Sequence, residues 1–408
     1  MPHETDQLVT ETAEVVARRS YGKLVAFLAA RTGDVTTAED ALADAFAAAL
    51  VDWPVSGIPR SPEAWLMTVA RRRSVDAARR RRTRGEAADH LRLLADDWGD
   101  PMDDTAIPDR RLALMFACAH PAIDPAIRAP LILQTILGFD GAAIASALLV
   151  SPATMSQRLV RAKHKSRYAG IPFRVPERSE MAERLDAVLA AIYAAYSEGW
   201  PEGAGRNLAE EALWLGRLVA ALLPEEPEAL GLLALMLHAE ARRAARSDAA
   251  GAYVPLDEQD TALWHTDMIE EAESLLLRAS TMGMIGRYQL EAAVQSAHAA
   301  RRLTGRSDWA AIERLYAALS AMTDSPVVAI NHAIAIAETQ GAEPGLASLD
   351  AHAMDKRLAD YQPYWAARAE LLRRTGEADA ADQAYRRAID LATDAAVRDY
   401  LRRRRMLI

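Results

Sequence analysis

Helical periodicity is the feature that most constrains the fold of this chain. After residue 180, Ala and Leu recur with the spacing of one helix face, and no strand-like alternation of any length is present. An apolar period of about 3.6 residues buries one stripe of a helix and cannot bury one face of a strand. The pattern therefore predicts an all-α fold. From Leu185 to Met282 this helical pattern has no regular repeat length.

Length, cysteine content and hydropathy restrict the class of protein. A chain of 408 residues has room for about two to four domains, each with its own core. Cys118 is the only cysteine, which excludes an intrachain disulfide and suits a reducing compartment. The first twenty residues carry acids instead of a signal-peptide pattern, and no apolar run approaches the length of about 18 residues typical of a membrane span. We therefore expect a cytoplasmic protein that has no membrane contact.

Two basic segments stand out in a chain whose net charge is −9. Arg71–Arg84 holds eight Arg and one acid, and Pro152–Arg174 holds six Lys or Arg and no acid. Because the chain as a whole is acidic, any affinity for DNA has to come from these local patches or from a partner that holds the chain on DNA. Two basic helices predict two contacts with one polyanion.

The second basic segment has the pattern of a helix-turn-helix. A short helix precedes a turn at Leu149 and Val150, and Ser151 and Pro152 supply an N-cap and a first-turn proline. On the helix that follows, apolar residues face the first helix, and polar or basic residues gather on another side that could reach base edges and phosphates in the major groove. The alternative is a surface helix pair with a solvated basic face. The residues predicted to contact DNA are Thr154, Gln157, Arg158, Arg161 and Lys165.

The first basic segment is expected to form a helix that begins at Ser61 and Pro62. On a helical wheel, this helix has an apolar stripe that packs on the protein and a separate basic stripe that meets solvent or phosphate. Trp65 lies near the boundary, where it can complete a core, the commoner role, or stack on an unpaired base. Asp76 is expected to pair with neighbouring Arg side chains and orient them. The residues predicted to contact DNA here are Trp65, Thr68, Arg71, Arg72, Asp76, Arg79 and Arg80.

In these motifs, residues 15–170 resemble a sigma factor of the extracytoplasmic-function class, the sigma-70 relatives reduced to regions 2 and 4. Thr36–Leu50 resembles the core-binding helix of region 2, and Ser61–Arg82 resembles its −10 recognition helix. Phe139–Arg167 resembles the region 4 helix-turn-helix that reads the −35 element. Two positions depart from the family pattern. Arg72 stands where the family often has Asn, and Leu149 stands where many relatives have Gly in the turn.

The resemblance implies that core RNA polymerase and promoter DNA are the partners. The residues it places against the basic clamp helices of the polymerase are Glu39, Asp40, Asp44 and Phe46. An alternative for the acids is simple stabilisation of a helix N-terminus. The resemblance implies no enzymatic activity, no cofactor and no metal. Cys118 and His120 are two residues apart, so on a helix their side chains point to different faces and do not form a nucleophile–base pair.

The predicted domains are region 2 at 1–85, an acidic linker at 86–111, region 4 at 112–176 and a helical extension at 177–408. The linker assignment depends on Glu86–Asp104, which holds seven acids and a single Arg. The boundary at 176 depends on two prolines within Gly170–Glu180.

The helical extension is similar to tetratricopeptide repeats from about residue 300. Tyr364–Asp394 carries the pattern of small and large residues through which the two helices of such a repeat pack, and Tyr316 lies 69 residues before Tyr385, about two 34-residue periods. Stacked repeats predict an α-solenoid whose concave face binds a regulatory protein or ligand, or controls the sigma regions in cis; mere stabilisation is the alternative. The pattern positions are Trp365, Ala369, Leu372, Gly376, Ala381, Tyr385 and Ala388.

Two alternatives stay open at this point. A stand-alone transcription regulator, with a helix-turn-helix and a helical sensor domain, would bind duplex DNA without a polymerase, usually as a dimer on a palindrome. The basic run Arg402–Arg405 is either a third DNA contact or a favourable set of charges at the C-terminal end of a helix, and we favour the helix-end interpretation.

Overall fold

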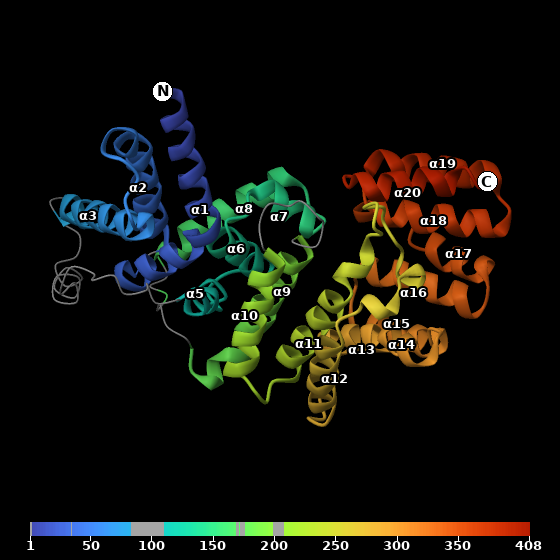
Figure 1. The fold of residues 1–408 in the computed structure, drawn as a ribbon. Coiled ribbons are helices and arrows are strands. Elements are labelled where there is room, and N and C mark those ends of the chain that lie inside the picture. Colours follow the sequence, from blue (N-terminus) through green and yellow to red (C-terminus); the bar gives the residue numbers. More distant parts are fainter. Residues whose placement is uncertain (1, 34, 83–109, 169–170, 172–175, 199–207) are drawn as a thin grey trace. The chain divides into compact units, whose positions relative to one another are not determined.

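The computed structural model describes residues 2–33, 35–82, 110–168, 171, 176–198 and 208–408 (Figure 1). Within these ranges the chain is helical and forms no strand, apart from an isolated bridge between Ser247 and Tyr253. The predicted all-α fold class is confirmed. The chain divides into two compact units, Met1–Ala212 and Leu213–Ile408, which are described one at a time. The predicted acidic linker, 86–111, falls almost entirely outside the described residues.

Eight described helices lie within the first unit, and a ninth crosses its end. They are α1 (Pro2–Thr32), α2 (Val35–Ser56), α3 (Pro62–Arg82), α5 (Arg111–Cys118), α6 (Pro125–Leu137), α7 (Gly141–Ala147), α8 (Pro152–Tyr168), α9 (Arg178–Glu198) and, at the end, α10 (Leu208–Leu222). Helices α1, α2 and α3 pack on one another around Leu24, Leu42, Trp53 and Leu66, which are fully buried. Apolar residues spaced along each helix thus build a three-helix core.

A second group in this unit is built from α5, α6, α7, α8 and α9. Asp140 caps α7 by accepting hydrogen bonds from the backbone N–H groups of Ala142 and Ala143, at 2.9 and 2.8 Å. Helix α9 packs on α5 and α6, so it belongs to the first unit although it follows the predicted boundary at 176. The division between compact units instead falls inside α10, between Ala212 and Leu213.

The two helix groups of the first unit meet at a glycine. A Cβ atom added to Gly22 of α1 would lie 1.8 Å from the carbonyl oxygen of Ile136 on α6. Only glycine lets the two backbones approach this closely without a shift. Helix α1 therefore packs directly against α6 as well as against α2 and α3.

The second unit is a chain of helices in which sequence neighbours pack on one another. After α10, its helices are α11 (Pro227–Ala241), α12 (Thr266–Ser280), α13 (Arg287–Ala299), α14 (Arg301–Thr304), α15 (Trp309–Met322), α16 (Pro326–Thr339), α17 (Ala342–Asp350), α18 (Gln362–Thr375), α19 (Ala378–Leu391) and α20 (Ala395–Arg405). Between α11 and α12 the chain forms three short 3₁₀ helices, at 243–246, 256–258 and 261–263. The pairs α15–α16, α16–α17 and α18–α19 are the closely packed neighbours of the C-terminal half.

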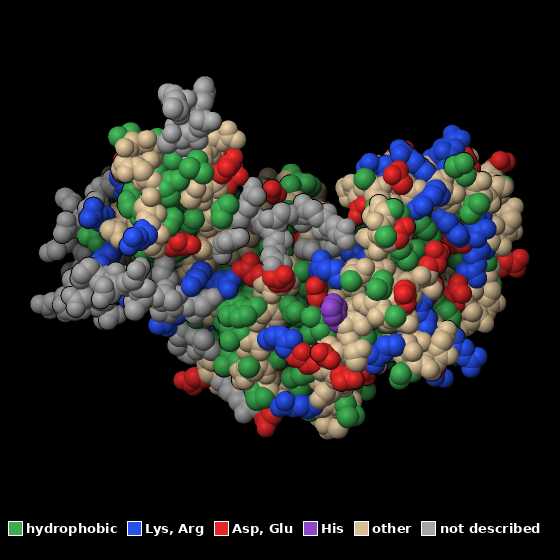
Figure 2. Space-filling view, viewed as in Figure 1, with side chains coloured by type: hydrophobic (Ala, Val, Ile, Leu, Met, Phe, Trp, Pro, Cys, Tyr) green, Lys and Arg blue, Asp and Glu red, His purple; other side chains and the backbone are tan. Residues whose placement is uncertain are grey.

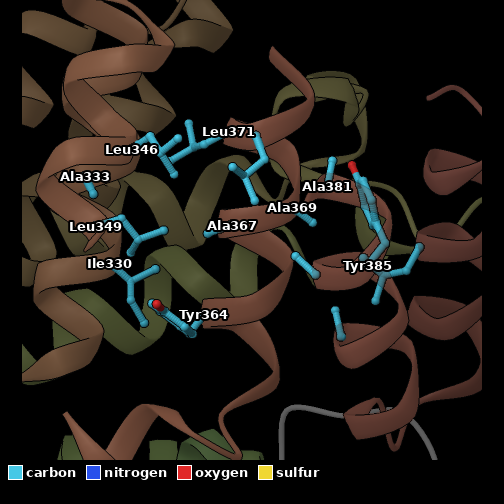
Figure 3. Close-up of a cluster of buried hydrophobic side chains, with 14 of the residues drawn as sticks. Ile330, Ala333, Leu346, Leu349, Tyr364, Ala367, Ala369, Leu371, Ala381 and Tyr385 are labelled. Atoms are coloured by element: carbon cyan, nitrogen blue, oxygen red, sulfur yellow. The ribbon is translucent and has the colours of Figure 1, made fainter. Parts of the chain in front are cut away.

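A buried cluster joins α16 to α19 (Figure 3). Figure 3 shows Ile330 and Leu349 facing Tyr364, and Tyr385 of α19 beside Ala381. Helix α18 ends at Gly376, whose φ of 83° lies in the left-handed region that favours glycine. Five residues of the repeat-like pattern are no more than 2% exposed: Ala369, Leu372, Ala381, Tyr385 and Ala388.

The basic run at the end of the chain is paired inside its own unit. Arg404 donates to Glu370 of α18 at 2.8 Å, and Arg405 to Asp382 of α19. Arg402 pairs with Asp399 one turn earlier at 3.0 Å. Figure 2 likewise shows Lys, Arg, Asp and Glu side chains interspersed over the second unit. Arg402, Arg404 and Arg405 thus have acidic partners within the unit, and basic charges at the C-terminal end of a helix are also favoured by its dipole.

Two buried histidines make the second unit sensitive to acid. Burial, followed by the charge of Arg242, lowers the pKa of His238 on α11 and of His298 on α13 to about 4 each. His238 Nε2 lies 3.5 Å from Glu273. This carboxylate does not outweigh the effect of burial on the pKa of His238. Because the folded pKa lies below the ordinary 6.5, the folded state binds fewer protons. Stability is therefore full above pH 6.5 and is lost as the pH falls towards 4.

We expect the free energy of unfolding to decrease by up to about 1.4 kcal/mol per pH unit for each histidine between these limits. Urea denaturation at pH 7.5, 6 and 5, followed by circular dichroism, measures this slope. The double variant His238→Gln, His298→Gln should show a flatter pH dependence than the parent. Parallel pH profiles for the two proteins would contradict the assignment.

Candidate promoter and polymerase interfaces

Helix α8 has one buried and one exposed side. Met155, Leu159 and Ala162 are buried, and α8 packs against α7 and α6. This division agrees with the periodicity of the sequence. The residues predicted to contact DNA are all exposed: Thr154, Gln157, Arg158, Arg161 and Lys165. The α8 basic face, defined as Arg158, Arg161 and Lys165, is therefore presented to solvent as one surface.

The turn before α8 orients this surface. Leu149 has a φ of 53°, the one non-glycine residue with a positive φ in the described chain, and the N–H of Val150 donates to Ala145 at 2.9 Å. This closes α7 with a left-handed residue, a backbone conformation that glycine usually supplies. Ser151 then caps α8 by accepting a hydrogen bond from the N–H of Thr154 at 3.3 Å.

The strained turn gives a testable prediction for stability. Leu149→Val should lower the free energy of unfolding by about 1 to 2 kcal/mol, because a β-branched residue tolerates a positive φ poorly. Leu149→Asn should lose less, since Asn adopts this conformation readily. Leu148→Val is the matched control, because it removes the same methylene from a leucine that is also partly buried. The φ of Leu148 is −105°, so this substitution tests the lost methylene without a positive φ. If chemical denaturation shows the same decrease in the free energy of unfolding for Leu148→Val and Leu149→Val, backbone strain at Leu149 is wrong.

Helix α3 also divides into a buried and an exposed side. Leu66 and Ala70 are fully buried, and Thr68 and Arg72 are exposed. Trp65 is half-buried and packs edge-on against the buried Trp53, with ring centroids 5.5 Å apart. Arg71 is also half-buried. The side chains of the other predicted contacts, Asp76, Arg79 and Arg80, lie outside the described residues, although the helix continues to Arg82.

The predicted polymerase-binding residues lie on α2 in two different settings. Asp40 and Asp44 are exposed one turn apart, and Phe46 is half-buried. Glu39 is held by Lys163 of α8, whose Nζ lies 2.8 and 3.0 Å from the two carboxylate oxygens. Sequence reasoning missed Lys163, because the two residues are 124 positions apart and no local pattern connects them.

A cavity of about 630 Å³ opens beside this ion pair. Acidic side chains dominate its polar lining, with Lys163 as the basic group and Tyr21 of α1 on its wall. Burial raises the pKa of Tyr21, and Glu39 and Asp40 raise it further. Asp140, at the edge, is already engaged as the cap of α7. The cavity thus lies where α1, α2, α8 and the α6–α7 connection come together.

Cys118 and His120 do not form a reactive pair. Cys118 is 2% exposed, and burial raises the pKa of its thiol. His120 accepts a hydrogen bond from the N–H of Ala122 at 3.1 Å through Nδ1, and burial lowers its pKa. Across the described residues, no group of three or more His, Cys, Asp or Glu is arranged to hold a metal ion. Among the described helices, none combines the length and apolar character needed to cross a membrane.

Comparison with known protein families assigns the N-terminal helices. The sigma-70 region 2 family matches residues 16–84, which cover α2, α3 and the C-terminal half of α1. Residues 16–84 are therefore a sigma-70 region 2 segment. The exposed acids of α2 and the basic helix α3 both lie within the matched region 2.

Two further matches are to proteins of unknown role. A family of unknown function, DUF6596, matches residues 184–280, from α9 to the end of α12. An uncharacterized protein of Rhizobium meliloti (strain 1021) is 39% identical over 376 residues, which are 90% of this chain and 88% of that protein. The match therefore includes most of both compact units. No solved structure matches the chain.

Proposed function

We propose that this protein is a sigma-70 factor of the extracytoplasmic-function class that binds core RNA polymerase and directs promoter-specific initiation of transcription in the cytoplasm. The observation that carries the proposal is the region 2 match on three packed helices, α1 to α3. The exposed basic face of α8 supports a second DNA contact, because a basic helix presented to solvent suits the major groove.

The two helix groups of the first unit have separate roles in this proposal. Asp40 and Asp44 on α2 meet basic helices of the polymerase, and α3 holds the −10 element. The turn at Leu149 and the helix α8 act as a helix-turn-helix that reads the −35 element, with Arg158 and Arg161 at phosphates or base edges. The protein contributes positioning and strand recognition, and the polymerase performs the chemistry.

From about residue 300, the second unit is proposed to form a tetratricopeptide-like solenoid that regulates the sigma regions or docks a partner. Antiparallel neighbours such as α16–α17 and α18–α19, with a left-handed glycine between α18 and α19, support this assignment. Deletion of the second unit, Leu213–Ile408, tests it directly, because it leaves α9 packed on the first unit. Unchanged regulation of the promoter in cells would remove the regulatory role.

Transcription with purified components tests the main proposal. Multi-round transcription from the promoter region of the gene that encodes this protein is measured with core polymerase alone, and with core polymerase plus the protein. A discrete transcript that requires the protein is the expected result. No transcript, together with specific duplex binding by the protein alone, would instead indicate a stand-alone regulator, which binds DNA without polymerase.

A further inference from the structure

One connection in the second unit is much longer than its neighbours. Helices α11 and α12 are joined by residues 242–265, whereas connections between packed helices usually have about 2 to 8 residues. Connections of this length are uncommon and are often functional. We call residues 247–264 of this connection the inner strap. Figure 1 shows it, in yellow, on the inner side of the arc of helices that runs from α12 to α20.

The C-terminal part of the inner strap is fixed on the unit. Trp264 is 5% exposed and packs in a buried cluster with residues of α11, α12 and α13. Arg301 of α14 lies over the Trp264 ring, 5.3 Å from its centroid. The same guanidinium donates hydrogen bonds to the backbone carbonyls of Asp257 and Gln259, at 2.7 and 2.8 Å. Main-chain hydrogen bonds and an aromatic anchor are also the means by which a protein surface binds an extended peptide.

The N-terminal part of the inner strap reaches the last helix of the unit. The Tyr253 ring packs edge-on against Tyr400 of α20, with ring centroids 5.4 Å apart. Residues 248–251, just before this contact, are exposed to solvent. In an open solenoid each repeat contacts only its neighbours. Here the strap instead joins helices from the two ends of the unit and occupies the surface between them.

We propose that the inner strap covers a peptide-binding surface of the second unit, and that a partner protein reaches this surface when Tyr253 leaves Tyr400. One aromatic pair can be displaced by a competing ring, while the buried Trp264 keeps the other end of the strap in place. The partner segment that fits is extended, with an aromatic residue for Tyr400 and backbone carbonyls for Arg301. This inference deepens the proposed docking role of the second unit and rests on it.

Hydrogen–deuterium exchange of the full-length protein tests closure by the strap. The N–H of Val254 donates to the Arg246 carbonyl at 2.7 Å, so its exchange reports on the closed form. In Tyr253→Ala, Tyr400→Ala and the double variant, the strap should exchange about two- to tenfold faster, as expected for loss of one edge-on aromatic pair. The three increases should be equal, because each variant removes the same contact. Tyr361→Ala, at a half-buried tyrosine on the same apolar cluster as Tyr400, is the matched control and should exchange like the parent.

A labelled synthetic peptide of residues 249–260 tests the covered surface by fluorescence anisotropy. The parent protein should bind it weakly, because its own strap competes at a high effective concentration. Tyr253→Ala should bind the peptide at least about threefold more tightly, since its strap is loosened and Tyr400 remains. Tyr400→Ala loosens the strap equally but lacks the ring that receives the peptide, so it should bind no more tightly than the parent.

Each outcome decides one claim. Equal strap exchange in the parent and in Tyr400→Ala would overturn closure by the aromatic pair. Faster exchange in Tyr253→Ala without tighter peptide binding would overturn the peptide-binding surface, and a partner would then dock on the outer side of the unit. Neither assay contains polymerase or promoter DNA. A transcription assay that shows no transcript dependent on the protein would therefore overturn the proposed function, while exchange and peptide binding still decide the strap.

Discussion

Replacement of both Arg158 and Arg161 by alanine should lower promoter-dependent transcription by about ten- to a hundredfold at moderate salt. Both side chains are exposed on the α8 basic face, so their removal should leave the folded unit intact. If each contacts one phosphate, the slope of log affinity against log salt concentration becomes shallower by about 0.9 for each lost contact. The measurement is fluorescence anisotropy of labelled promoter DNA with the assembled holoenzyme, between about 50 and 200 mM salt.

A matched control separates this effect from a change in net charge. Arg306→Ala with Arg314→Ala removes two exposed arginines from the second unit. This control should retain the parental transcription and salt slope. If the Arg158, Arg161 variant binds less tightly but keeps the parental slope, direct phosphate contact at these residues is wrong, and a base contact becomes the better explanation.

Glu370→Ala should be the most damaging single change in the second unit away from its apolar core. Burial raises the pKa of Glu370, but hydrogen bonds from Arg373, Arg404 and Tyr385 lower it to about 2. The Tyr385 hydroxyl donates at 2.8 Å from a side chain that is 1% exposed. Removing the acceptor leaves a buried hydroxyl and two guanidinium groups without their partner, at a cost of about 2 to 3 kcal/mol.

Urea denaturation at pH 7.5 measures this loss, because the carboxylate is fully ionised well above a pKa of about 2. Glu343→Ala, an exposed acid at the start of α17, is the control and should change stability by less than about 0.5 kcal/mol. Tyr385→Phe in the Glu370→Ala background should recover part of the loss, since it removes the unpaired hydroxyl. A Glu370→Ala midpoint equal to that of the control would show that the three donors find other partners.

Local features of the fold could be predicted from the sequence because they depend on neighbouring residues. Helical periodicity correctly placed Met155 and Leu159 on the buried side of α8 and Arg158 on the exposed side. The Ser151 cap follows from the preference of a serine for that position. Even the unusual residue of the turn, Leu149, could be singled out, although its positive φ had to be observed.

Features that join distant segments could not be predicted. In the sequence, Lys163 cannot be told apart from the other basic residues of α8. It reaches Glu39 of α2 because the two helix groups of the first unit pack together through α1 and α6. The same limit applies to the end of the first unit. Prolines near residue 176 indicate a break in the chain, but they carry no signal that the next helix, α9, packs back on α6.

The contacts of α20 determine where the second unit can be cut when it is exchanged between related proteins. Its Arg404 and Arg405 join it to α18 and α19, and the Tyr400 ring packs edge-on against Tyr253, 5.4 Å away, in the segment between α11 and α12. A hybrid protein that ends before this helix would remove ion-pair partners from α18 and α19 and the ring contact from Tyr253. Swaps should therefore retain the chain through Arg405, whereas a reporter fused after it, beyond the 84% exposed Met406, should be tolerated.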